Sequence, residues 1–296
     1  MSSTGSSAGI QHLHLGGPVW SCPHWVGSLF PTGARAPSFL GHYARVFNAV
    51  EGNSTFYGVP PAATFTRWRE STPEGFRFCL KVPRTITHDR MLTGAERPWA
   101  EFITASAALG DRAGPTMIQL PPGFGPARLA ALARWLEALP VDRSFAVEPR
   151  HPAYFDGGAA HRDLDALLRE HAVDRVIFDT TVLHASRAVD PEIVAAQERK
   201  PRLPVASATT AMHPIVRLVG VGVPGACVEV FEHWADRIAV WIGEGRSPFV
   251  FVHTPDDRDV PALCASFHAA LGRRLDVGTL PAWPTPASGQ ISLFDP

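Results

Sequence analysis

The 296-residue sequence has few cysteines and no long apolar run. Its four cysteines, Cys22, Cys79, Cys227 and Cys264, are far apart and form no CxxC pair, which argues against a disulfide framework and a zinc knuckle. No stretch of about 18 uninterrupted apolar residues is present to cross a membrane. Residues 1–10 lack the basic and apolar regions of a secretion signal. These absences predict a soluble, cytoplasmic protein that does not act at a membrane.

The sequence also lacks an excess of charge of either sign. Its formal net charge is −1 at pH 7, so the overall field would not draw the protein onto nucleic acid, and any such binding would need a local basic patch. A content of 45% hydrophobic and 19% charged residues is typical of a globular protein. The length suits one large barrel domain, since such barrels often reach about 250 residues or more.

Short runs rich in Val, Ile and Phe alternate with longer segments of helical period. Eight runs are predicted as strands: His12–Leu15, Val46–Glu51, Phe76–Lys81, Thr116–Leu120, Ser144–Glu148, Arg175–Asp179, Ile215–Val219 and Phe249–His253. This alternation is typical of a parallel sheet with crossover helices. No dinucleotide-type glycine fingerprint follows the first run, so the pattern favours a closed (β/α)8 TIM barrel over an open doubly wound sheet.

The ends of the chain differ from the barrel segment. We predict a disordered tail over residues 1–10, one α/β barrel domain over 11–279, and an extended tail over 280–296, which contains four prolines. Residues 184–213 are long and Pro-rich enough to form either a loop or an irregular helix.

Polar residues lie at the ends of nearly all the predicted strands. In chain order they are Glu51, Lys81, Gln119, Glu148 with Arg150 and His151, Asp179, Arg217 and His253. Catalytic groups of TIM barrels lie where strands end and the following loops begin, so we expect these side chains to share one mouth. The alternative is that the charges neutralise one another in a structural network.

The mixture of charges indicates two kinds of chemistry. Clustered carboxylates from Glu51, Glu148 and Asp179 either raise one pKa for general acid catalysis or hold a divalent metal. Arginines bind anions bidentately, so Arg150 and Arg217 among these carboxylates suit a substrate with a phosphate group or sugar hydroxyls.

Three local stretches add candidate pocket residues. These are NAVEGNSTFY with Asn53, Thr55 and Tyr57, KVPRTITH with Lys81, Arg84 and His88, and EPRH with Glu148 and Arg150 on one side of an extended segment.

Metal binding has less support in the sequence. No HExxH motif occurs, and the HxH formed by His12 and His14 starts the first strand, at the wrong end for a barrel mouth. A divalent metal held by Glu51, Glu148, Asp179 and His253 is possible but not favoured, and the cofactor stays unknown.

Taken together, these motifs resemble the YecE-like proteins, domain-of-unknown-function family 72. The resemblance rests on Trp20 and Trp25, VEGNSTFY from Val50, Trp68 with Pro73 and Phe76, KVPRTITH from Lys81, IQLPPGF from Ile118 and AVEPRH from Ala146. It implies a TIM barrel whose pocket is lined by Glu51, Thr55, Tyr57, Lys81, His88, Gln119, Glu148, Arg150 and His151. The family has no settled reaction, and its barrel is similar to those of sugar isomerases and apurinic endonucleases.

The sequence departs from that family after the seventh and eighth strands. Arg-Leu-Val-Gly, with Val219, stands where the family usually has Arg-Leu-His-Gly, and His253 and Thr254 stand where it has paired asparagines. His253 then offers the imidazole that Val219 lacks.

We expect an enzyme that acts on a phosphate-bearing or nucleic-acid substrate, with hydrolase chemistry on a phosphodiester favoured. In this hypothesis Glu148 or Glu51 is the general base and His88 or His151 is the acid. The anion is held by Lys81, Arg150 and Arg217. Two alternatives stay open: a sugar isomerase-like enzyme, and a catalytically silent barrel that binds a ligand or serves as an adaptor.

The C-terminal pentapeptide QISLF, from Gln290 to Phe294, resembles the motif by which bacterial DNA-repair proteins dock onto the sliding clamp. Leu293 and Phe294 would be two apolar anchors, and Gln290 would fix the register through its amide. This interpretation predicts the clamp as a partner and a role in DNA repair. In the alternative, Leu293 and Phe294 fold back to cap the bottom of the barrel.

Overall fold

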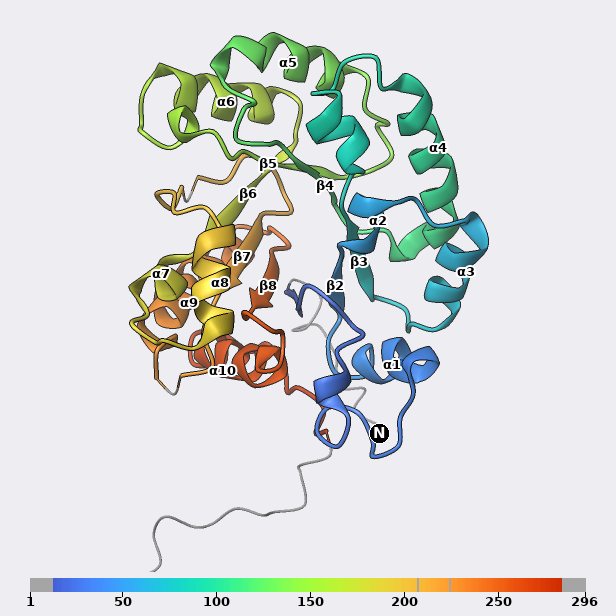
Figure 1. Cartoon of the computed structure of the whole chain (residues 1–296), viewed down its shortest axis with the longest axis vertical. Helices are drawn as coiled ribbons and strands as arrows, with labels where there is room; N and C mark the ends of the chain where they lie inside the picture. The colour runs from blue at the N-terminus through green and yellow to red at the C-terminus, as the bar shows by residue number, and fades with distance from the viewer. Residues whose placement is uncertain (1–12, 207, 224, 284–296) are drawn as a thin grey trace, which may run out of the picture.

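The computed structural model describes residues 13–206, 208–223 and 225–283, and these residues form a (β/α)8 barrel. Its eight strands are β1 (His14–Gly16), β2 (Ala49–Gly52), β3 (Arg77–Leu80), β4 (Thr116–Gln119), β5 (Phe145–Glu148), β6 (Asp174–Asp179), β7 (Ile215–Val219) and β8 (Phe249–His253). Figure 1 shows the strands as an inner ring with the helices outside. The predicted barrel is therefore confirmed. His12 and residues 284–296, with the predicted clamp motif, lie outside the described residues.

The helices connect successive strands around the ring (Figure 1). They are α1 (Ala36–Tyr43), α2 (Ser54–Tyr57), α3 (Ala62–Glu70), α4 (Glu96–Ser106), α5 (Leu129–Glu137), α6 (Ala159–Glu170), α7 (Thr181–Ala185), α8 (Pro191–Arg199), α9 (Val228–Gly243) and α10 (Val260–Gly272). Short helical turns occupy Pro23–Trp25, Thr85–Asp89, Ala107–Arg112, Pro126–Arg128 and Pro152–Tyr154. The segment 184–213 contains both predicted alternatives, because α8 is flanked by irregular chain. No helix of the described residues is long and apolar enough to span a membrane.

The strands pair in parallel. Six of them follow the order β1-β8-β7-β6-β5-β4, and β2 pairs with β3. Single bridges from Phe78 to Ala113 and from Lys81 to Met117 join β3 to β4. Between β1 and β2 the side chain of Asn48 takes the place of a ladder, because its amide accepts from Leu15 N (2.8 Å) and donates to the carbonyl of Leu13 (2.8 Å). These contacts close the ring.

The junction between β1 and β2 also depends on a tyrosine and a glycine. The hydroxyl of Tyr43 accepts from Gly17 N (2.7 Å) and donates to the carbonyl oxygen of Ala49 (2.9 Å). A Cβ at Gly16 would lie 1.8 Å from that same carbonyl oxygen. Since backbone and hydroxyl approach so closely, only glycine fits at position 16.

The barrel interior holds one small cluster of side chains, called the interior layer below, to which β8 contributes two successive inward residues. It comprises Ala49, Cys79, Met117, Ala146, Val176, Ile215, Phe249 and Phe251. The other buried apolar residues form a larger core between the strands and the helices. Because strand side chains alternate between faces, the residue two positions after a member of the interior layer also faces inward, nearer the carboxyl end of its strand.

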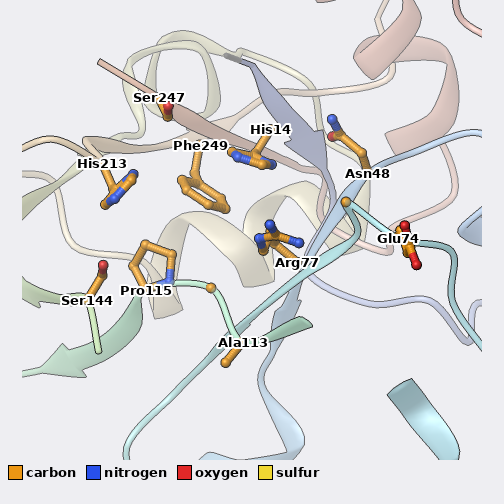
Figure 2. Close-up of a pocket in the computed structure, with 12 residues that line it drawn as sticks. His14, Asn48, Glu74, Arg77, Ala113, Pro115, Ser144, His213, Ser247 and Phe249 are labelled. Carbon is orange, nitrogen blue, oxygen red and sulfur yellow. The ribbon is translucent and has the colours of Figure 1, made fainter. Parts of the chain in front are cut away.

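A cavity of about 720 Å³ lies at the opposite end of the barrel, where the strands begin (Figure 2). Asn48, Arg77 and Ser144 line it just before or at the start of three strands, and His213 and Phe249 lie at the starts of two others. Amino-terminal faces of TIM barrels serve stability more often than catalysis.

Candidate active site

The strand-end polar residues lie directly above the interior layer. Glu51, Lys81, Gln119, Glu148, Arg217 and His253 follow Ala49, Cys79, Met117, Ala146, Ile215 and Phe251 by two positions each. The alternation of strand side chains therefore turns all six toward the mouth of the barrel.

Arg217 lies between two buried carboxylates. Its Nε and Nη2 donate to Oε1 and Oε2 of Glu51 at 2.6 and 3.0 Å, and its Nη1 donates to Oε2 of Glu148 at 2.6 Å. The side chains of Glu51 and Glu148 are each 1% exposed. This bidentate geometry suits a guanidinium and not an ammonium, so arginine is the residue required on β7.

Glu148 has two further partners. Gln119 donates from Nε2 to Glu148 Oε1 at 2.6 Å, and Arg150 forms an ion pair with the same oxygen. The guanidinium carbons of Arg150 and Arg217 lie 4.3 and 4.9 Å from the ring centroid of Phe178. Phe178 therefore supports both cations through cation–π contacts.

Glu51 is held on its other side by neutral groups. Asn53 Nδ2 donates to Glu51 Oε2 at 2.9 Å, and His253 Nε2 lies 3.1 Å from Glu51 Oε1. Burial and the charge of Arg217 lower the pKa of His253 to about 4 despite the opposing attraction of Glu51. His253 is therefore neutral at pH 7 and donates its Nε2 proton to the carboxylate.

The two glutamates are ionised. Burial by itself would raise the pKa of each. The charge of Arg217 and the hydrogen bond from His253 hold the pKa of Glu51 well below its usual value, and Arg150 and Arg217 lower the pKa of Glu148. A carboxylate stabilised in this way is a weak proton acceptor at pH 7. The glutamates therefore serve to position the guanidinium groups.

Among the described residues, Lys81 is the strand-end cation that has no ion-pair partner. Its ammonium forms no ion pair or hydrogen bond with any described residue, and it lies 5.5 Å from the ring centroid of Phe56. The residue is 7% exposed, and its Nζ is not completely enclosed by the described residues, so the ammonium keeps a narrow contact with solvent. Burial and the charge of Arg217 lower the pKa of Lys81 to about 8.

A second lysine reaches the same mouth from the end of α8. The Nζ of Lys200 lies 5.7 Å from the ring centroid of Phe178, and within the described chain it too lacks an ion pair and a hydrogen bond. Burial and the charge of Arg217 lower its pKa to about 8. Asp257 interacts electrostatically with Lys200, and burial raises the pKa of Asp257 to about 6.

Lys200 was not among the candidate residues predicted from the sequence, although the composition of the chain makes it unusual. Of the 27 Lys and Arg residues in the chain, only Lys81 and Lys200 are lysines, and every other one is arginine. Both lysines lie beside the cluster of Glu51, Arg217 and Glu148. Four cations thus face two ionised glutamates and Asp257, which makes the mouth attractive to an anion.

The structure does not bring Asp179 into this cluster. Its carboxylate accepts from Trp234 Nε1 and from Thr181 N, both at 2.8 Å. On β6 the inward positions belong to Val176 and Phe178, so Asp179 faces the helix layer. Its contacts are those of a residue that anchors α9 and begins α7.

The remaining candidates surround the mouth. Thr55 donates to the carbonyl of Lys81 at 2.6 Å and thus fixes the end of β3. His88 packs edge-on against Phe56, with ring centroids 5.0 Å apart, and burial lowers its pKa. His151 accepts from Ala153 N and shapes its own turn.

Tyr57 and Arg84 lie farther out. Tyr57 is 81% exposed, and Arg84 forms a surface ion pair with Asp89.

The donor set does not fit a divalent metal. Within residues 13–206, 208–223 and 225–283, no group of three or more His, Cys, Asp or Glu side chains is placed to hold a metal ion. Glu51 and Glu148 already bind guanidinium groups, and Asp179 faces away from them.

The fold and the site together define a (β/α)8-barrel protein with a charged, anion-attracting mouth. The sequence model of the family described as "Protein of unknown function DUF72" matches residues 14–288. The UPF0759 protein YecE of Escherichia coli strain K12 is 37% identical over 283 residues, which cover 95% of this chain and all of that protein. The chain therefore belongs to the DUF72 family, as the sequence motifs indicated.

More distant relatives agree with this assignment. The UPF0759 protein YunF of Bacillus subtilis is 26% identical over 135 residues, or 43% of this chain and 48% of that protein. A crystal structure of a DUF72 family protein from Enterococcus faecalis superposes with a TM-score of 0.66 at 17% identity, covering 91% of this chain and 98% of the other. One from Thermotoga maritima gives a TM-score of 0.60 at 21% identity, covering 88% and 98%. These likenesses establish the fold.

Proposed function

We propose that the protein is an enzyme that binds a phosphate-bearing substrate at the carboxyl end of the barrel. The observation that carries this proposal is the pair of accessible ammonium groups of Lys81 and Lys200, which have no counterion among the described residues. An anion that bridges them would gain two charge-assisted hydrogen bonds in a largely buried site.

The ion cluster of Glu51, Arg217 and Glu148 serves in this proposal as a fixed support. It holds Arg150 beside the phosphate position through Glu148, and Phe178 keeps Arg150 and Arg217 in their planes. A preorganised support of this kind lowers the reorganisation needed as charge develops on a substrate.

Proton transfer is assigned to Lys81. With a pKa of about 8, Lys81 is mostly protonated at pH 7 but retains a substantial neutral fraction near its pKa. His88, close to Phe56, is the second candidate for an acid or base. This assignment replaces the glutamate base that the sequence suggested, because both glutamates are committed to arginines.

The test is a titration of the full chain with inorganic phosphate by calorimetry, beside Lys81→Met, Lys200→Met and the double variant. Each single variant is expected to weaken binding about tenfold or more, since a hydrogen bond to a charged group contributes roughly 1.5–3 kcal/mol. Arg97→Met is the matched control, because Arg97 pairs only with Glu101 on the exposed surface. Binding that is unchanged in the double variant, or absent from the wild type, refutes the proposal.

The nucleic-acid version of this proposal depends on the C-terminal pentapeptide. Gln290, Leu293 and Phe294 match the clamp-docking pattern in sequence and would bring the barrel to DNA. A peptide spanning residues 286–296 is titrated with purified sliding clamp, beside a peptide with alanine at 293 and 294. Equal binding by both peptides, or none by either, removes the reason to place the protein near DNA.

A further inference from the structure

The chain uses lysine at only two positions, and both lie at the same mouth. Everywhere else its cationic side chains, histidine aside, are arginines, including Arg150 and Arg217 in the mouth itself. Arginine is always charged and binds anions at least as well as lysine, so anion binding alone does not require lysine here. What lysine adds is an amine that can lose its proton and act as a nucleophile.

Lys81 has the surroundings of a nucleophilic amine. The ammonium has no ion pair to hold its proton, its stem is enclosed at the end of β3, and its tip is accessible. The Thr55 hydroxyl fixes its backbone on both sides, since it donates to Lys81 O and accepts from Lys81 N at 3.2 Å. Burial, and after it the charges of Arg217 and Arg150, disfavour the protonated form and lower the pKa of Lys81 to about 8.

From this juxtaposition we infer that Lys81 forms an imine with the carbonyl carbon of a phosphate-bearing aldehyde or ketone. The inference rests on the proposed function: once Lys81 loses its proton it no longer holds the phosphate, which stays on Lys200 and Arg150 and leaves the carbonyl carbon within reach of the neutral Nζ of Lys81.

The step balances without any redox partner. The neutral Nζ of Lys81 attacks the carbonyl carbon, a C–N bond forms, and a proton moves from nitrogen to oxygen to give a carbinolamine. The ammonium of Lys200 then donates a proton to the hydroxyl, the C–O bond breaks, and water leaves as the nitrogen lone pair forms the C=N bond. Lys200 ends as a neutral amine, and the product is a protonated imine that acidifies the neighbouring C–H bond.

The two glutamates support this chemistry by their position. Both interact electrostatically with Lys81, and neither pairs with it, so they stabilise the cationic iminium without removing the amine's availability. Their charges stay fixed because Arg217 holds both of them.

The experiment traps the imine by reduction. Wild-type protein is incubated with glyceraldehyde 3-phosphate, with glyceraldehyde, or with an oligonucleotide that contains an abasic site, and sodium borohydride is then added. The adduct is located by peptide mass spectrometry. The modified amine can be assigned unambiguously, because the primary amines of the chain are those of Lys81, Lys200 and the N-terminus. Lys81→Arg keeps the charge and removes the nucleophile, and its melting temperature reports whether it folds.

We expect an adduct on Lys81 that is lost in Lys81→Arg and in urea-unfolded wild type. An adduct on Lys200 or the N-terminus, an equal adduct in the unfolded chain, or none with any probe overturns the inference. If phosphate binds but no adduct forms, the imine is excluded while the proposed function stands. If glyceraldehyde reacts as fast as its phosphate and phosphate does not bind, the imine stands and the proposed function falls. Reaction with only one of the two phosphate-bearing probes separates a sugar phosphate from an abasic nucleotide.

Discussion

Replacing Arg217 by methionine tests the buried ion cluster most directly. The substitution keeps an unbranched side chain of similar length but leaves Glu51 and Glu148 without their shared cation. Three hydrogen bonds of 2.6–3.0 Å are lost at once. Removing one partner of a buried ionic network costs about 3–5 kcal/mol, against a total stability of about 5–15 kcal/mol for a natural domain. The melting temperature should therefore fall by about 10 °C or more.

Removing Arg217 should affect Glu51 more than Glu148. Glu148 keeps Arg150 and Gln119, whereas Glu51 keeps only Asn53 and the neutral His253. In the variant, burial is no longer opposed by Arg217, so the pKa of Glu51 rises above its usual value, or His253 gains the proton instead. The folded variant thus takes up a proton that the wild type does not bind at pH 7.

This proton uptake determines whether the variant's free energy of unfolding rises or falls with pH. In the wild type, the lowered pKa of Glu51 contributes stability above its unfolded pKa of about 4.5 that is lost only as the pH falls through the lower folded value. In Arg217→Met the folded state binds the additional proton, so the variant becomes more stable as the pH falls from neutral toward about 5.

The assay is denaturant unfolding of both proteins at about pH 8, 7 and 5, with the surface variant Arg97→Met as the control. The difference between wild type and Arg217→Met should be largest at the highest pH. A difference below about 1 kcal/mol at pH 7, or one that does not change with pH, would show that the glutamates are not both buried and ionised.

Three further predictions follow from the same contacts. Phosphate binding should weaken as the pH rises through about 8, because Lys81 and Lys200 lose their charges there. Calorimetry across that pH range, on the wild type and the double lysine variant, measures the change in affinity. A wild-type affinity that does not change with pH contradicts the prediction. Trp234→Phe should lower the free energy of unfolding by about 1–3 kcal/mol, because Asp179 loses a buried donor, and phosphate binding should not change. Trp241→Phe is the control for the lost ring area. A loss of phosphate binding in Trp234→Phe would place Asp179 in the site. Burial raises the folded pKa of Asp174 from 3.8 to about 7, so the contribution of Asp174 to stability declines as the pH rises between those values. Asp174→Asn should flatten that part of the curve of stability against pH. An identical slope in the wild type and the variant would rule out this contribution of Asp174.

Most of the strands could be predicted because they are short apolar runs rich in Val, Ile and Phe, although β1 (HLG) and β2 (AVEG) carry little of this signal. The predicted runs from Ile215 to Val219 and from Phe249 to His253 match β7 and β8 at both ends. The side-chain phase within a strand was harder to predict. Asp179 looked equivalent to Glu51, yet pairing of Phe178 with Arg217 in the ladder turns Phe178 inward and Asp179 outward.

Lys200 could not be found from periodicity, because it follows a helix inside a long Pro-rich connection. Its position beside Phe178 depends on contacts distant in sequence, such as the hydrogen bond from Thr180 Oγ1 to the carbonyl of Pro201 (3.1 Å). The scarcity of lysine was visible in the composition, but the structure was needed to place both lysines near Arg217 and Glu51.

Arg217 also links parts of the chain that are far apart. It joins β7 to Glu51, 166 residues away on β2, and to Glu148, 69 residues away on β5. If the chain were cut in the connection between β4 and β5, one fragment would carry Glu51 and the other would carry Arg217 with Glu148. Each fragment alone would then expose an uncompensated charge where the other fragment belongs. Two such halves should associate when mixed, because Arg217 of one fragment forms its ion pair with Glu51 of the other. Self-association of either half would leave these charges unpaired and is therefore disfavoured.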